Sequence, residues 1–304
     1  MFEELIKKLK SDRYITLETT PGHSPVFEPI MDKIEKLGLH EKVDGFSTTD
    51  NPLSKLKFNA IIAAYMLQQR FNKPSLATVS MRDRNKIALQ SDLLGANALD
   101  VRSVLALTGD SAKISNQPNT KGVFEGDSSL MLDIIKCFNS GIDYAGAPLA
   151  EKPKTIYPFA VTNSYAKNNK TLQKKLKKKI EHGALGIISQ PVYDISNAQM
   201  LLDLLEDAKS ECNFCSDTQM ILGIFPITKF RTAQFLSSHV PGIHVPPRWV
   251  EELRAASEIS IEEERKVGMK MSKDLLDSVM RLHPKVHIMT ANQFSVAKEL
   301  LRDY

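Results

Sequence analysis

The 304-residue chain lacks any uninterrupted apolar run long enough to cross a bilayer, and it has only three cysteines. The first absence excludes a membrane-spanning helix, and the second excludes a scaffold built on disulfides. The chain begins with MFEELIKKLK, which mixes acids and bases at helical spacing. A secretion signal instead places basic residues before an apolar core. We therefore expect a cytoplasmic protein that does not contact a membrane.

Charge of one sign is also scarce, because the formal net charge is only +4. No basic stripe interleaved with aromatic residues is present, so nucleic acid is not an expected partner. The densest basic segment is KKLKKK at 174–179, which continues a helical apolar pattern. We interpret it as a solvated helix face, with an anion site at one end of that helix as the alternative.

Several short motifs are missing as well. The chain contains no GxGxxG after its first predicted strand, no GxxxxGK[ST] and no GxSxG. These absences argue against a Rossmann fold, a P-loop nucleotide site and a hydrolase nucleophile elbow. Cys212 and Cys215 form a CxxC without a second pair, and zinc sites usually require four ligands, so no metal site is predicted.

Short strand-like runs alternate with longer runs that have helical apolar spacing. The predicted strands are Tyr14–Thr19, Val43–Thr49, Ser75–Met81, Ser103–Asp110, Tyr157–Ser164, Leu185–Val192, Met220–Ile227 and Lys285–Thr290. The predicted helices are Val26–Leu37, Lys55–Phe71, Arg84–Leu99, Ser128–Phe138, Thr171–His182, Ala198–Ala208, Thr232–Ser238 and Phe294–Leu301. This order predicts a single (β/α)8 TIM barrel over residues 1–304, with an extra helical pair, Trp249–Ala256 and Ile261–Leu282, inserted before the last strand.

Polar residues stand where the predicted strands end. Glu18 stands next to last in the run YITLET, and Asp110 follows VLALTG. In a barrel the carboxyl ends of the strands meet at one rim, so these groups would share a pocket for a polar, planar ligand. Both carboxylates are candidates for proton transfer. The alternatives are a solvated strand end for Glu18, a turn or helix cap for Asp110, and a backbone-satisfying role for Gln190.

Longer motifs make the interpretation more specific. They are FSTTDNP at 46–52, MRDRNKIALQSDLLGANAL at 81–99, VLALTGD at 104–110, KGVFEGDS at 121–128, GALGIISQPVYD at 183–194, GIFPITKFRTAQFL at 223–236 and HVPPRWVEEL at 244–253. In this order they resemble the methylenetetrahydrofolate reductase family, in its short microbial catalytic-domain form. The resemblance implies a barrel that binds FAD at the strand ends. It also implies NADH or NADPH as the donor for reduction of methylenetetrahydrofolate to methyltetrahydrofolate.

The resemblance also implies roles for individual residues. Glu18 matches the general acid that helps to open the folate ring, Asp110 matches an aspartate that contacts the pterin and tunes the flavin, and Gln190 matches a substrate-binding glutamine. A segment that packs on substrate in the family contains Phe230, Thr232 and Leu236. The positions on the cofactor side are Thr49, Thr78, Thr108, Gly109, Asp110, Thr162, Asn163 and Lys179, the last near the cofactor phosphates.

Departures from the family pattern concentrate on the cofactor side. Thr78, Thr108, Thr162 and Leu172 stand where better-studied members have histidine, arginine, tyrosine and aspartate. Two other functions are therefore open. One is direct hydride transfer from the nicotinamide to the same folate without flavin. The other is a folate-binding subunit, without reductase activity of its own, that works within a homo-oligomer or with a partner protein.

Overall fold

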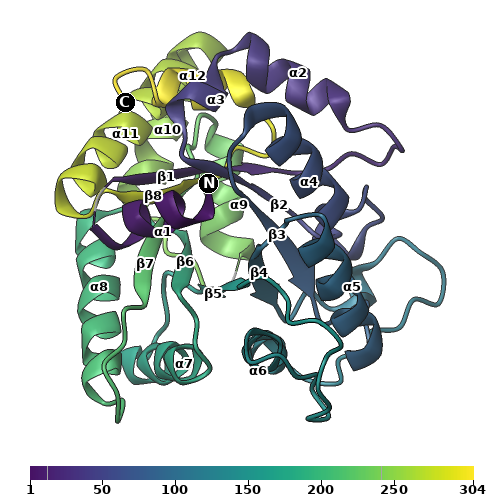
Figure 1. The fold of residues 1–304 in the computed structure, drawn as a ribbon. Coiled ribbons are helices and arrows are strands. Elements are labelled where there is room, and N and C mark those ends of the chain that lie inside the picture. Colours follow the sequence, from purple (N-terminus) through teal and green to yellow (C-terminus); the bar gives the residue numbers. More distant parts are fainter. Residues whose placement is uncertain (12, 241) are drawn as a thin grey trace.

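The computed structural model describes residues 1–11, 13–240 and 242–304, and its centre is a closed barrel of eight parallel strands in sequential order (Figure 1). The strands are β1 (Tyr14–Thr19), β2 (Gly45–Thr48), β3 (Ser75–Ser80), β4 (Ser103–Leu107), β5 (Tyr157–Thr162), β6 (Gly186–Pro191), β7 (Gln219–Ile224) and β8 (Lys285–Ile288). Strands β2, β3 and β8 are buried along their whole length, as is typical of parallel strands that are covered on both faces. All eight predicted strands and the predicted fold class are confirmed.

Twelve α-helices are described; α1 precedes the first strand, and most of the others follow strands and cover the outside of the barrel. They are α1 (Phe2–Ser11), α2 (Glu28–Lys36), α3 (Leu39–Lys42), α4 (Ala60–Phe71), α5 (Lys86–Ala98), α6 (Ser128–Asn139), α7 (Asn169–Glu181), α8 (Ile195–Ser210), α9 (Phe230–His239), α10 (Pro247–Ile259), α11 (Ile261–Leu282) and α12 (Phe294–Leu300). Side-chain caps fix several helix starts, because Asn59, Asn85 and Asp194 each accept a hydrogen bond from an amide in the first turn of the helix that follows.

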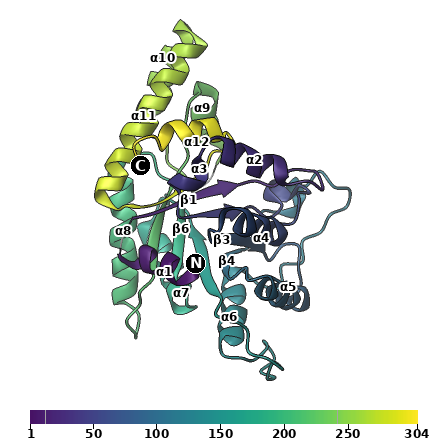
Figure 2. The same ribbon diagram turned by 45° about the horizontal axis from the view of Figure 1, so that its top comes forward.

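The capping residues also explain where the predicted boundaries are wrong. The helix predicted from Lys55 begins only at Ala60, because the chain first forms a 3₁₀ turn at Pro52–Ser54 and Asn59 then caps α4. The fourth strand ends at Leu107, so Asp110 lies in the loop beyond it. The inserted helical pair is confirmed as α10 and α11, which project from the barrel as a hairpin (Figure 2).

The barrel closes where β8 pairs with β1, in a register that aligns Thr16 with His287. Beyond the strand ends, the side chain of Asn292 continues this seam. Its amide nitrogen donates to the carbonyl of Thr20 at 2.6 Å, and its oxygen accepts from the amide of Thr20 at 2.9 Å. One side chain therefore ties the first strand to the last at the same end of the barrel as Glu18.

Apolar side chains fill the other end of the barrel interior. Leu5 and Leu9 of α1 pack there with inward-facing residues of several strands: Tyr14, Leu76, Leu105, Phe159, Ile188 and Ile221. Helix α1 thus plugs the amino-terminal end of the barrel. Because that end is closed and filled, an interior cavity can open only towards the carboxyl ends of the strands.

Candidate active site

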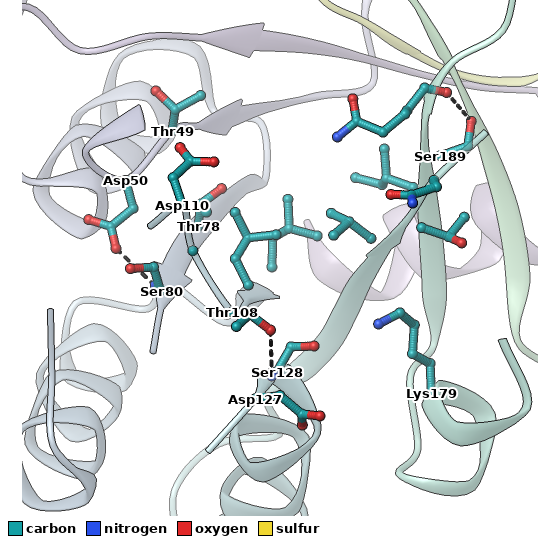
Figure 3. Close-up of a pocket in the computed structure, with 18 of the residues that line it drawn as sticks. Thr49, Asp50, Thr78, Ser80, Thr108, Asp110, Asp127, Ser128, Lys179 and Ser189 are labelled. Atoms are coloured by element: carbon teal, nitrogen blue, oxygen red, sulfur yellow. Dashed lines mark hydrogen bonds between the residues drawn. The ribbon is translucent and has the colours of Figure 1, made fainter. Parts of the chain in front are cut away.

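A cavity of about 560 Å³ opens at the carboxyl ends of the strands (Figure 3). Its apolar floor consists of Leu105, Leu107, Val161 and Ile188, which continue the packed barrel interior. Ten of the residues predicted for the site line this cavity: Glu18, Thr49, Thr78, Thr108, Gly109, Asp110, Thr162, Asn163, Lys179 and Gln190. The rim that the strand pattern predicts is therefore a real pocket.

Glu18 lies on β1 and faces the barrel interior together with His287 of β8. These two residues alternate with Leu17 and Ile288, which belong to the outer core between the strands and the helices. Glu18 Oε2 lies 4.0 Å from His287 Nε2. The histidine is held by Thr16, whose Oγ1 lies 2.7 Å from Nδ1, and by Ser47, whose Oγ lies 3.3 Å from Nε2.

Burial sets the protonation states of this pair. The Glu18 side chain is about 24% exposed, and the loss of solvent raises the pKa of its carboxyl from the ordinary 4.5 to about 7. Burial also lowers the pKa of His287 to about 4, so its imidazole is neutral at physiological pH. The contact between them is therefore not an ion pair, and the histidine carries no charge that would stabilise the ionised glutamate.

The raised pKa predicts that Glu18 destabilises the fold at alkaline pH. Between pH 4.5 and about pH 7 the folded protein keeps a proton that the unfolded chain has released, so stability falls as pH rises through this window. Glutamine cannot ionise. We expect Glu18→Gln to raise the free energy of unfolding at pH 8 by up to about 3 kcal/mol, with a small effect at pH 5. Urea unfolding at both pH values measures this, and an equal effect at both would contradict it.

Asp110 also lines the cavity, from the loop after β4. Its Oδ2 accepts a hydrogen bond of 2.7 Å from the backbone amide of Leu53. Gly109, just before it, has φ of +92°, and a Cβ there would lie 3.0 Å from the Cβ of Arg82. Glycine is therefore required for the loop to pass this close to β3 and to present Asp110 at the rim.

Gln190 is brought to the rim by an irregularity between β6 and β7. The pairing register of these strands shifts between Ile188 and Pro191. Gly223 permits the shift, because a Cβ at this position would lie 2.3 Å from the carbonyl oxygen of Ser189. Gln190 is exposed, whereas its neighbours along β6 are buried, so its amide is available to a ligand.

Positive charge enters the cavity from α7, where Lys179 points towards the interior (Figure 3). Lys178 is neutralised by Asp127 at 2.7 Å. Within the described part of the chain, no carboxylate lies within ion-pair distance of Lys175 or Lys179, and burial lowers the pKa of Lys179. Asp110 and Lys179 lie on opposite walls, so the cavity is acidic on one side and basic on the other.

Hydroxyl groups occupy much of the remaining wall. The buried hydroxyls of Thr49, Ser80 and Thr162 have no hydrogen-bond partner among the described residues, and all three side chains line the cavity. Unpaired buried polar groups are costly in a folded protein, so these oxygens are suited to pairing with a bound ligand or water. At the amino end of α6, Thr108 Oγ1 and Asp127 Oδ1 already accept from the amides of Ser128 and Ser129.

Three predicted substrate-side residues lie elsewhere. Phe230, Thr232 and Leu236 are on α9 and are not among the residues that line the cavity. Phe230 and Leu236 pack on a separate apolar cluster that contains Tyr193 and Trp249. The structure thus brings ten of the predicted residues together in the cavity and leaves these three on α9, outside the cavity lining.

Sequence reasoning did not identify His287 as part of the site. The signal that could have found it is the strand KVHI, in which one imidazole alternates with apolar residues that face the outer core. It also did not identify Ser80, Ser189 and Met289, which line the cavity from β3, β6 and the end of β8. Ser80 and Ser189 are small hydroxyl residues within buried strands, where they resemble ordinary core positions.

A closed barrel whose strand-end cavity holds a protonatable carboxyl, and two lysines of α7 without an ion-pair partner among the described residues, defines an enzyme-like site of the TIM-barrel class. A family model described as methylenetetrahydrofolate reductase matches residues 2–304. The chain therefore belongs to the methylenetetrahydrofolate reductase family. Comparison with the sequences of curated proteins gives no significant match.

Solved structures with the same fold include a Clostridium thermocellum protein described as binding two copies of 5-methyl-5,6,7,8-tetrahydrofolic acid. It is 14% identical over 98% of both chains, with a TM-score of 0.63. EDTA monooxygenase (EmoA) from Chelativorans sp. BNC1 is 9% identical over 95% of this chain and 92% of its own, with a TM-score of 0.55. Long-chain alkane monooxygenase (LadA) is 8% identical over 95% and 90%, with a TM-score of 0.57. At such identities the likeness shows the fold alone.

One further observation concerns the helices. Over residues 1–11, 13–240 and 242–304, none of them is both long and apolar enough to span a membrane.

Proposed function

We propose that the protein reduces 5,10-methylenetetrahydrofolate to 5-methyltetrahydrofolate with NADH or NADPH, and that Glu18 is the general acid. The observation that carries this proposal is the Glu18 carboxyl, which opens into the cavity with a pKa raised to about 7. A carboxyl with an ordinary pKa would be ionised at neutral pH and could not donate a proton.

The proton from Glu18 has a defined use in this reaction. Transfer of that proton to a nitrogen of the folate five-membered ring lets the bond from this nitrogen to the methylene carbon break. The methylene group remains on the other nitrogen as an iminium cation. Addition of a hydride to the iminium carbon then gives the methyl group, and Glu18 is left ionised until it takes up a proton.

A neutral His287 is compatible with Glu18 acting as the general acid. A protonated imidazole 4.0 Å from Glu18 would favour the ionised carboxylate and lower its pKa. Burial keeps the imidazole uncharged, and its contacts with Thr16 and Ser47 hold the ring in place. With a pKa of about 7, the carboxyl therefore keeps a substantial protonated fraction at neutral pH beside a fixed, uncharged neighbour.

The two-sided charge of the cavity suits a folate. The pterin ring carries amino and ring N–H donors, which the Asp110 carboxylate and the Gln190 amide oxygen would accept. The glutamate end of folate is anionic and would be attracted to unpaired lysines such as Lys175. Binding of 5-methyltetrahydrofolate by the Clostridium thermocellum protein of the same fold adds support.

The residues present also fit a flavin nucleotide. Lys179 would face the phosphates, and the unpaired hydroxyls of Thr49 and Thr162 could pair with the polar edge of the ring system. A bound flavin would supply the hydride carrier between the nicotinamide and the folate. In this arrangement the protein's own residues orient the two reactants, exclude water and deliver the proton from Glu18.

Direct hydride transfer from the nicotinamide is a second candidate. Thr78, Thr108 and Thr162 leave short side chains where family members have histidine, arginine and tyrosine, and Leu172 is fully buried in the outer core. A leucine in the core cannot make the polar contact that an aspartate makes at the same position. The loss of several cofactor contacts together is the observation that favours a flavin-free reaction.

The visible spectrum of the purified protein separates these candidates. With a bound flavin we expect twin absorption bands that bleach when NADH is added without oxygen. A protein that stays colourless after incubation with FAD and FMN but oxidises NADH in a folate-dependent way would support direct transfer. The absence of folate-dependent NADH and NADPH oxidation in either state would contradict a reductase and leave a folate-binding role.

A further inference from the structure

The segment Asn51–Ser54, which follows β2, has an unusual backbone. Asn51, Leu53 and Ser54 have φ of 44°, 56° and 56°, and none of them is glycine. Left-handed backbone is disfavoured for residues that carry a Cβ, and three such residues within four positions are rare. Strained conformations of this kind persist only where the surroundings fix them, and they are frequent at functional sites.

Apolar burial does not explain the strain, because Leu53 is 56% exposed and the buried member of the segment is the polar Ser54. Hydrogen bonds hold the segment instead. Arg82 Nη2 donates to the carbonyl of Asn51 at 3.0 Å, and the amide of Lys57 donates to Asn51 Oδ1 at 2.8 Å. At the other end, Ser115 Oγ donates to the carbonyl of Ser54 at 2.7 Å.

Arg82 is itself fixed. Its side chain is 1% exposed, and it forms two hydrogen bonds to Asp83, from Nε at 2.7 Å and from Nη2 at 2.6 Å. The planar guanidinium can hold a carboxylate and a backbone carbonyl at the same time, which a lysine ammonium cannot do with the same geometry. Arg82 therefore ties the strained segment to the loop after β3.

This arrangement positions the backbone amide of Leu53, which donates a hydrogen bond to Asp110 Oδ2 at 2.7 Å. Asp110 is otherwise an exposed residue in a loop, where a carboxylate would rotate freely. With Oδ2 occupied by the protein, the orientation of the carboxylate is set and Oδ1 remains for another donor.

We propose that Asn51–Ser54 is a positioning segment that pre-orients Asp110 for its ligand, and that Arg82 is the positioning residue that maintains it. The ligand side of this inference rests on the proposed function, in which Asp110 accepts hydrogen bonds from the pterin. The carboxylate is already ordered before the ligand binds, so binding does not have to restrict its rotation. A contact with a fixed carboxylate therefore contributes more to affinity. The strain in the segment is then part of the site.

The contact can be tested without any ligand. We expect hydrogen exchange of the amides in residues 51–57 to be faster in Asp110→Ala than in the parent, because the Leu53 amide loses its acceptor. Exchange in α8, which lies away from this loop, serves as the internal control and should not change. Equal exchange of the segment in both proteins would overturn the inference.

The effect on binding needs a double-mutant cycle with 5-methyltetrahydrofolate as the probe. Arg82→Lys keeps the positive charge but cannot hold Asp83 and the Asn51 carbonyl with the same geometry, so it should weaken binding about tenfold. Leu53→Ala keeps the amide and should bind as the parent does. In an Asp110→Ala background, Arg82→Lys should cause no further loss. Independent, additive losses would overturn the inference. If the parent does not bind the probe, the proposed function fails, while hydrogen exchange still decides whether the Leu53–Asp110 contact forms.

Discussion

Glu18→Gln is expected to lower the rate of folate reduction by about a hundredfold to ten-thousandfold, the usual contribution of a general acid. Glutamine has nearly the same size and can donate a hydrogen bond, but it cannot transfer a proton. The folate ring would then have to open without acid assistance. The measurement is kcat for folate-dependent oxidation of NADH at pH 6.5, where the parent carboxyl is largely protonated.

Two controls make this result specific. Glu41→Gln changes an exposed glutamate on α3 and should leave kcat unchanged. Oxidation of NADH with an artificial electron acceptor, which needs no folate ring opening, should also survive in Glu18→Gln. A variant that reduces folate within a few-fold of the parent would show that another group supplies the proton.

Asp110→Asn should raise the Kd for 5-methyltetrahydrofolate by about tenfold to a hundredfold, as expected for loss of a hydrogen bond to a charged acceptor. The amide offers one acceptor oxygen and places a donor where the carboxylate had a second acceptor. If a flavin is bound, the loss of a nearby negative charge should also raise its reduction potential. Titration calorimetry and an equilibrium redox titration measure these two quantities.

Asp203→Asn is the matched control, because Asp203 is exposed on α8 and bonds only to Gln199 in its own helix among the contacts described. That variant should bind folate as the parent does. Unchanged affinity together with an unchanged potential in Asp110→Asn would remove Asp110 from the site.

The fold was predictable because the residue preferences, the apolar spacing and the capping residues all indicate the same strands and helices. Strands such as Tyr14–Thr19 are short and rich in β-branched residues, and helices such as α8 carry a regular apolar face behind a capping aspartate. Since the carboxyl ends of barrel strands meet at one rim, the positions of Glu18, Asp110 and Gln190 followed from the strand ends alone. The family motifs then assigned chemistry to positions that were already expected to be neighbours.

The contacts that tune the site were not predictable in this way. The Glu18–His287 contact joins residues that are far apart in the chain, and it depends on the register between β1 and β8. The Leu53–Asp110 hydrogen bond depends on left-handed backbone at Leu53 and Ser54, which the preferences of leucine and serine do not indicate. The α9 residues assigned to the substrate do not line the cavity for a similar reason, since the place of this helix against the Tyr193 and Trp249 cluster depends on packing between distant segments.

The seam between the first and last strands has a consequence for the proton on Glu18. Glu18 and His287 lie on the two strands that pair where the barrel closes, and Asn292 ties the same end of that seam together. Separation of β8 from β1 would expose the Glu18 carboxyl to water and lower its pKa towards the ordinary value, because burial is what raises it. Opening of the seam is therefore expected to release a proton at neutral pH, so the closed barrel and the protonated carboxyl stabilise each other.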